Sequence, residues 1–160
     1  MTTPRQPLSP EAAFTRAAAR CATTEYCNAD WRRRLAQAGL TPQEVADVLE
    51  RLQREGFIDE ARYARAYARD KALYDRWGQL KIRQGLAAKG IADEDIAAAL
   101  ADVDEDVWEK NLRDLLAQKN RSLRAADDYE RRQKLMRFAA GRGYETELIF
   151  GIIDQFSGAD

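Results

Sequence analysis

The sequence predicts an all-α protein in which three tandem three-helix repeats form an elongated, curved, solenoid-like chain. One observation is the weakness of strand signals, because no long alternating run of valine, isoleucine and threonine occurs. A second is the composition: hydrophobic residues make up 45% and charged residues 33% of the 160 residues, which favours a real core covered by solvated helices. The third is an internal repeat with a period of about 50 residues.

Each copy of the repeat consists of a helix, a corner made of a glycine and an apolar residue, and a shorter helix, with another helix before them. The aligned positions are Trp31, Leu35, Gly39, Leu40, Val45 and Leu49, then Ile82, Leu86, Gly90, Ile91, Ile96 and Leu100, then Leu135, Ala139, Gly143, Tyr144, Ile149 and Ile153. One unit buries little surface alone, so we expect neighbouring units to stack. The expected units are 10–56, 57–104 and 105–160, after a disordered tail at 1–9.

Helix starts and stops divide the first unit into three helices. Ser9 as N-cap and Pro10 in the first turn open the first helix. Thr41, with Glu44 three residues later, forms a capping box that opens the third. The expected helices cover about 10–22, 28–38 and 42 up to the glycine at 56. Gly39, Gly56 and Gly90 lie just past predicted helix ends, where glycine commonly terminates a helix.

The second unit contains the most regular pattern in the chain. A helix over 60–77 would place two sets of side chains on different sides, at about 100° per residue. The aromatic set, expected in the core, is Tyr63, Tyr67, Tyr74 and Trp77. The cationic set, expected to be exposed, is Arg62, Arg65, Arg69 and Arg76. We expect structural roles for Phe57 as a core anchor, Asp59 as the cap of this helix, and Trp77 as the anchor of the corner at Gly78.

The third unit matches the repeat least well. A helix over 106–119 opens it, but Ala139 stands where the other copies have leucine and Gly141 lies near a helix end. The apolar stretch at 148–153 is compatible with either a short strand or a buried helix.

Charge is segregated along the chain although the formal net charge is only −1. Residues 62–89 carry eight cations and two anions, residues 91–109 carry eight acids and no cation, and residues 110–137 carry nine cations and four acids. Such blocks indicate local electrostatic docking surfaces. The alternative is that the blocks neutralise one another in the folded chain.

Residue types that support catalysis or cofactor binding are missing. There is no histidine, the commonest general base, and no glycine-rich phosphate loop. Cys21 and Cys27 lack the Cys-x-x-Cys spacing, and the acids at 93–95 and 102–106 lack the pattern of a calcium loop. We therefore expect no catalytic residue, no metal site and no cofactor. Two thiols, no signal-peptide pattern and no long apolar run indicate a cytoplasmic protein without membrane contact.

Four segments carry motifs of a known family: CATTEYCNADWRRRLAQAGL (21–40), GFIDEARYARAYARD (56–70), KALYDRWGQLKIRQGLAAKGI (71–91) and KLMRFAAGRGY (134–144). The second and third are the most specific, since Gly-Phe-Ile-Asp, Arg-Tyr-Ala, Arg-Asp-Lys and Trp-Gly-x-x-Lys-Ile follow at the expected distances. The pattern resembles the RecX regulatory proteins, bacterial modulators of the RecA recombinase. The resemblance covers nearly the whole chain from about Pro10.

The resemblance implies a non-enzymatic, all-helical protein that needs no cofactor. RecX-like proteins bind the groove of the RecA filament on single-stranded DNA. They suppress ATP hydrolysis, coprotease activity and strand exchange by capping or destabilising the filament.

We expect a monomer that contacts the filament and single-stranded DNA through the basic residues Arg62, Arg65, Arg69, Lys71, Arg76, Lys81, Arg83 and Lys89. Stacking on a base is the alternative role for Trp77. Two other functions stay open: a duplex-binding transcription factor with helix-turn-helix-like units, and an adaptor solenoid with protein partners alone. The balance between inhibition and stimulation also stays open.

Overall fold

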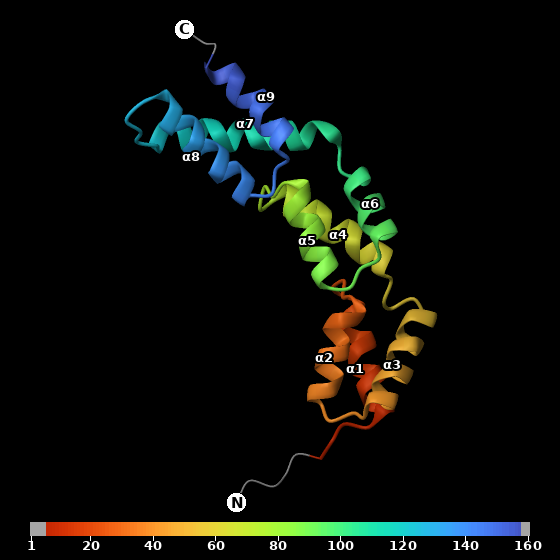
Figure 1. Ribbon diagram of the computed structural model, residues 1–160. Helices are drawn as coiled ribbons and strands as arrows, with labels where there is room; N and C mark the ends of the chain where they lie inside the picture. Colours follow the sequence, from red (N-terminus) through yellow and green to blue (C-terminus); the bar gives the residue numbers. More distant parts are fainter. Residues whose placement is uncertain (1–5, 158–160) are drawn as a thin grey trace, which may run out of the picture.

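The computed structural model describes residues 6–157, and within this range the chain folds into nine helices and no strand (Figure 1). The helices are α1 Pro10–Cys21, α2 Asn28–Gln37, α3 Pro42–Arg54, α4 Glu60–Leu73, α5 Gln79–Ala88, α6 Asp93–Asp102, α7 Glu105–Ser122, α8 Asp128–Gly141 and α9 Thr146–Ser157. The all-α prediction is confirmed, and the apolar stretch at 148–153 is helical. Residues 1–5 of the expected tail and residues 158–160 lie outside the described residues.

The expected capping residues form the expected hydrogen bonds. Ser9 Oγ accepts from the amide of Ala12 at 3.2 Å, which satisfies one of the free donors of α1. Thr41 and Glu44 exchange two such bonds at the start of α3, at 3.2 and 2.9 Å. Glycines with positive φ follow α2, α3, α5 and α8, because a side chain rarely adopts this backbone conformation: Gly39, Gly56, Gly90 and Gly143.

Three apolar clusters lie along the chain, one in each group of three helices, which we call units 1 (α1–α3), 2 (α4–α6) and 3 (α7–α9). The clusters are linked by side chains that cross between units. Cys27, which precedes α2, is fully buried in the cluster of unit 2, and Trp108 of α7 is buried in the same cluster. Leu148 of α9 contacts the clusters of units 2 and 3. Each unit therefore completes its core with residues from its neighbours, as expected for stacked repeats.

The units follow one another along an arc (Figure 1). The second helix of each unit, α2, α5 or α8, lies on the inner side of the arc, at the left of the view. Helices α3 and α6 lie on the outer side, at the right. The curved, elongated shape predicted from the repeat is confirmed, and it gives the inner side a single row of three helices.

The helix predicted over 60–77 is too long, and one of its aromatic residues was assigned wrongly. α4 ends at Leu73, and Arg76 then takes a left-handed conformation with φ of 55°. This turn brings Trp77 back against the cluster of unit 2, where its amide donates to the carbonyl of Lys71 at 3.0 Å. Tyr74, expected in the core, is 82% exposed because it precedes that turn.

Candidate functional site

The predicted basic residues of unit 2 do not form one patch. On α4, Arg65 and Arg69 are exposed, and Lys71 lies about 160° around the helix from Arg69 at 100° per residue. Arg69 approaches Asp102 of the outer helix α6 at 3.6 Å. Lys81 and Arg83 instead belong to the inner helix α5. The structure thus separates an arginine row on α4 from a second group of cations beside and on α5.

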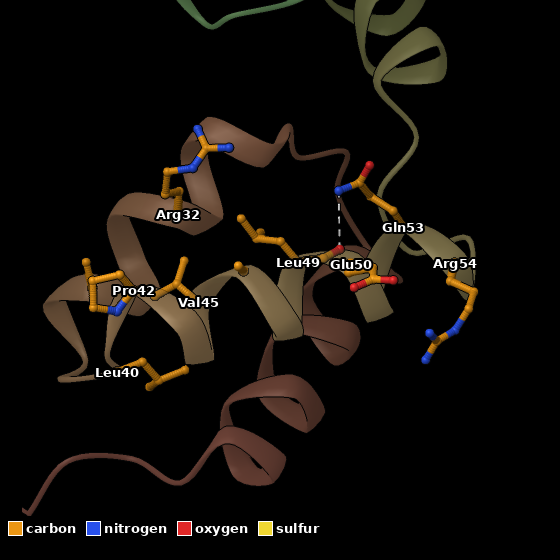
Figure 2. Close-up of a pocket in the computed structure, with 10 residues that line it drawn as sticks. Arg32, Leu40, Pro42, Val45, Leu49, Glu50, Gln53 and Arg54 are labelled. Atoms are coloured by element: carbon orange, nitrogen blue, oxygen red, sulfur yellow. Dashed lines mark hydrogen bonds between the residues drawn. The ribbon is translucent and has the colours of Figure 1, made fainter.

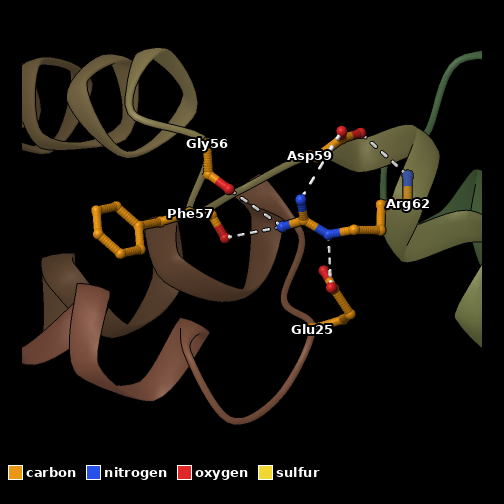
Figure 3. Close-up of polar contacts among 5 residues, drawn as sticks. All are labelled: Glu25, Gly56, Phe57, Asp59 and Arg62. Carbon is orange, nitrogen blue, oxygen red and sulfur yellow. Dashed lines mark hydrogen bonds and ion pairs between the residues drawn. The ribbon is translucent and has the colours of Figure 1, made fainter.

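Arg62 contributes to the junction between units 1 and 2 (Figure 3). Its Nε donates to Oε1 of Glu25 at 2.6 Å, and one terminal nitrogen donates to the carbonyls of Gly56 and Phe57 at 3.2 and 3.4 Å. The hydrogen bond to Glu25 raises the pKa of Arg62. The guanidinium of Arg62 in α4 thus contacts unit 1 and the segment between α3 and α4, and the sequence pattern did not reveal these contacts.

Lys89 also forms a contact between units 1 and 2. Its Nζ lies 2.9 Å from Oδ1 of Asp30 near the start of α2, and this hydrogen bond raises the pKa of Lys89. The side-chain amide of Asn28 in α2 also donates a hydrogen bond to the carboxylate of Glu60 in α4. Polar side chains thus add to the apolar contact that Cys27 makes between units 1 and 2, and Lys89 pairs across this junction while its side chain stays partly exposed.

The indole ring of Trp77 contacts two lysines. Lys71 Nζ is 4.6 Å and Lys81 Nζ is 4.4 Å from the ring centroid, both within the range of a cation–π interaction. Lys71 also pairs with Asp75 at 3.2 Å. The ring is half-buried against the core of unit 2, which agrees with its expected anchoring role. The two lysine ammonium groups already contact this ring, so a base would compete with them for it.

Arg76, which directly precedes Trp77, and Arg83 of α5 are both exposed. The carbonyl of Arg76 accepts a hydrogen bond from the hydroxyl of Tyr144 at 2.8 Å, so its backbone joins units 2 and 3 while its side chain faces solvent. Arg76 and the exposed ring of Tyr74 lie in the segment between α4 and α5.

The sign of the charge on a helix depends on whether the helix is the second or the third of its unit. Counting charged residues in consecutive blocks of the sequence did not reveal this. The second helices are basic: α2 has three arginines and one aspartate, α5 has one lysine, one arginine and no acid, and α8 has four cations and two acids. The third helices are acidic, with net charges of −1 for α3, −4 for α6 and −2 for α9. The inner side of the arc therefore carries the opposite charge from α3 and α6 on the outer side.

A groove of about 930 Å³ lies between α2 and α3 of unit 1 (Figure 2). Its apolar wall contains Leu40, Val45 and Leu49, and arginines stand along it on both helices, Arg32 on α2 and Arg54 on α3. The narrow side chains Ala36 and Ala46 keep it open. The groove adjoins the basic side of α2 and offers an apolar surface next to a guanidinium.

The described residues provide no metal site and no membrane span. Within residues 6–157, no group of three or more histidine, cysteine, aspartate or glutamate side chains is arranged to hold a metal ion. None of the described helices is both long enough and apolar enough to cross a membrane. Cys21 and Cys27 are free and buried, and burial raises the pKa of both thiols. A buried thiol with a raised pKa is a poor nucleophile.

Comparison with known proteins gives a consistent result. A family model described as the second three-helix domain of RecX matches residues 59–100, and one described as the third three-helix domain matches residues 105–153. The chain is 33% identical over 128 residues to the regulatory protein RecX of Pseudomonas fluorescens, covering 80% of this chain and 81% of the relative. It is 33% identical over 125 residues to that of Xanthomonas axonopodis pv. citri, covering 78% and 75%.

Solved structures support the fold. A crystal structure of a regulatory protein RecX superposes with a TM-score of 0.79 at 24% identity, over 91% of this chain and 73% of that one. The crystal structure of RecX from Lactobacillus salivarius gives a TM-score of 0.79 at 17% identity, over 92% of this chain and 96% of that one. At these identities the likeness concerns the arrangement of helices.

Proposed function

The chain belongs to the RecX family of regulatory proteins, and we propose that it binds the RecA recombinase filament on single-stranded DNA and modulates its activities, mainly by inhibition. The activities affected are ATP hydrolysis, coprotease function and strand exchange. The observation that carries the proposal is the family match over most of the chain. The curved row of basic helices supports it, because such a surface fits a partner that combines protein with a phosphate backbone.

The proposed contacts exclude two of the predicted residues. Arg62 and Lys89 pair with Glu25 and Asp30 of unit 1, and we assign both to the contact between units 1 and 2 rather than to a partner. The remaining candidates are Arg65, Arg69, Lys71, Arg76, Lys81 and Arg83. In this proposal the protein acts as a cytoplasmic monomer, catalyses no reaction and needs no cofactor.

The proposal is tested by the ATPase rate of the cognate RecA on single-stranded DNA, with this protein titrated in at substoichiometric amounts. We expect the rate to fall as filaments shorten. Charge reversal at Arg65 and Arg69 should weaken this inhibition while leaving the circular dichroism spectrum unchanged. Full inhibition by the folded double variant would remove the arginine row from the contact surface, and an unaffected ATPase rate at every ratio would reject the proposed function itself.

Two alternative functions predict different results. A transcription factor would bind duplex DNA with sequence preference, which requires side chains that read base edges. An adaptor would bind the recombinase equally well with and without DNA. Binding measurements with each component alone therefore separate both alternatives from filament regulation.

A further inference from the structure

The junction between units 2 and 3 is made by backbone contacts and by a large apolar side chain. The amides of Gly78 and Leu80 donate to the carbonyls of Arg142 and Gly143, at 2.8 and 2.9 Å. Trp108 of α7 is only 4% exposed and packs in the core of unit 2. Such a closely packed contact does not deform continuously, so units 2 and 3 form one body.

The junction between units 1 and 2 has a different composition. Among the backbone hydrogen bonds of residues 6–157, none joins α1, α2 or α3 to α4, α5 or α6. The described residues of unit 1 whose side chains contact the core of unit 2 are both small, Cys27 and Ala29. A thiol and a methyl group bury much less apolar surface than the indole of Trp108 does at the other junction. The apolar contact is therefore weaker between units 1 and 2.

Polar side chains supply the other contacts of this junction. Arg62 pairs with Glu25 at 2.6 Å, and Lys89 pairs with Asp30 at 2.9 Å. The side chains of Arg62 and Lys89 are 40% and 36% exposed, so solvent and salt weaken both pairs. Much of the attraction between units 1 and 2 therefore depends on the ionic strength.

The packing of this junction is incomplete on one side. A cavity of about 450 Å³ lies there, and its lining includes Asn28 and Gln53 from unit 1 and Glu60 and Asp95 from unit 2. Two oxygen atoms of these residues, Asn28 Oδ1 and Glu60 Oε2, are buried without a hydrogen-bond partner among the described residues. A buried oxygen atom without a partner costs free energy, which is recovered when water reaches it. Opening of the cavity thus offsets part of the loss of the other polar contacts.

We propose that unit 1 is a hinged arm that swings about residues 55–59 while units 2 and 3 stay together, and that ionic strength sets the balance between its closed and open positions. Movement between two units is expected when their interface is small and polar. Opening separates Arg62 and Lys89 from unit 1 and changes the curvature of the arc without a change inside any unit (Figure 1). The inference concerns the chain alone, so it goes beyond the proposed function and does not depend on it.

The test measures distances between two nitroxide labels by double electron–electron resonance, on the full chain with Cys21→Ser. Asp47, Ala98 and Gly151 are exposed and occupy equivalent positions on α3, α6 and α9, since the repeat shifts are 51 and 53 residues. The pair Asp47→Cys/Ala98→Cys spans the junction of units 1 and 2, and Ala98→Cys/Gly151→Cys spans that of units 2 and 3. The labels are attached at low salt, where Cys27 is buried, and the salt concentration is then raised from about 0.05 to 1 M.

At low salt both label pairs should give one narrow distribution of distances. At high salt a second distance should appear for the pair across units 1 and 2. The ratio of open to closed arms should rise by about tenfold, because each of the two exposed ion pairs contributes roughly threefold. The pair across units 2 and 3 should not change. Distributions that are unaffected by salt at both junctions would overturn the hinge, and equal broadening at both would overturn its assignment to unit 1.

A substitution at the junction should have the same effect without added salt. Lys89→Gln should produce the second distance at low salt, because it removes the charge that pairs with Asp30. The matched control Arg113→Gln removes a cation of similar exposure, 40% against 36%, whose partner Glu109 lies on the same helix α7. Equal distributions for the two variants would contradict the role of the ion pair. Small-angle X-ray scattering of the unmodified chain needs no substitution, and scattering curves that superpose at low and high salt would also overturn the hinge.

Discussion

A Cβ atom on Gly78 would overlap the carbonyl group of Gly143, so only a glycine fits where units 2 and 3 meet. The amide of Gly78 donates to the carbonyl of Arg142 at 2.8 Å, and the amide of Leu80 donates to the carbonyl of Gly143 at 2.9 Å. These bonds satisfy donors at the start of α5 that have no partner within the helix. The glycine of the Trp-Gly motif is therefore explained by the close approach of two backbones.

Gly78→Ala should lower the free energy of unfolding by about 1–3 kcal/mol, because backbone atoms have to move to admit the methyl group. The matched control is Gly151→Ala in α9, where a Cβ would meet no atom within 4 Å. That variant should instead gain about 0.5–1 kcal/mol, since alanine favours the helix. Urea unfolding followed by circular dichroism measures both, and equal effects of the two substitutions would contradict the backbone contact.

The pair between Arg62 and Glu25 should contribute to stability rather than to binding. Both side chains are partly exposed, so a double-mutant cycle with Arg62→Ala and Glu25→Ala should give a coupling of about 1 kcal/mol after screening by solvent. Arg62→Ala alone should cost more, about 1–3 kcal/mol, because the carbonyls of Gly56 and Phe57 also lose a donor. Wild-type stability with reduced affinity for the recombinase or for oligothymidine would show that Arg62 is a contact residue instead.

Local signals in the sequence predicted much of this fold. The capping side chains of Ser9 and Thr41 act on amides three residues away, and the glycine corners follow from backbone conformation alone. The partner of Arg62 lies 37 residues earlier in the chain, and nothing in the helical wheel of α4 reveals it. The left-handed turn at Arg76 also accompanies a distant contact, since the hydroxyl of Tyr144, 68 residues later, donates to the carbonyl of Arg76.

The basic residues were grouped from blocks of charge along the sequence, and this grouping does not show which side of a helix each residue occupies. Counting by blocks put Arg65 and Lys71 in one patch, although the helix places them on different sides. The basic row of second helices is visible in the sequence once the shifts of 51 and 53 residues are applied to charged positions, since Arg32 then aligns with Arg83. That this row lies on the inner side of an arc depends on how the units stack, which a repeat period does not specify.

The two aromatic residues at the end of α4 should respond differently to substitution. Tyr74→Ala should change the free energy of unfolding by less than about 0.5 kcal/mol, as is usual for an exposed side chain. Trp77→Ala should cost about 3 kcal/mol, because it removes a ring that packs against the core of unit 2. Thermal unfolding of the two variants makes the comparison. A large cost for Tyr74→Ala would favour the continuous helix over 60–77.

The thiol of Cys27 should report on the junction between units 1 and 2. It is fully buried in the core of unit 2, and burial raises its pKa, so it should not react with a thiol reagent at about pH 8 in the folded protein. Arg62→Ala should increase its rate of labelling, because it loosens the neighbouring contacts. Cys21→Ser leaves Cys27 as the remaining thiol, so the labelling is assigned without ambiguity. Rapid labelling of the folded Cys21→Ser protein would contradict the burial of Cys27.

The ion pair between Asp30 and Lys89 should make stability depend on pH in the acidic range. Burial raises the pKa of Asp30, but hydrogen bonds from Lys89 and from Cys27 outweigh it and hold the pKa below its ordinary value. The folded state then binds this proton less tightly than the unfolded state. The stabilisation is therefore present above the unfolded pKa of about 3.9 and is lost as the pH falls through the lower folded value.

We expect the difference in Tm between the unmodified chain and Asp30→Asn to be constant between about pH 7 and pH 5 and to shrink below about pH 4. The control is Asp47→Asn, an exposed acid on α3 whose substitution removes the same charge away from the junction. A difference for Asp30→Asn that stays unchanged down to the lowest pH at which the protein is folded would show that Lys89 does not stabilise the ionised carboxylate. In that case the contact between units 1 and 2 would depend on the packing of Cys27 and on the hydrogen bonds of Arg62.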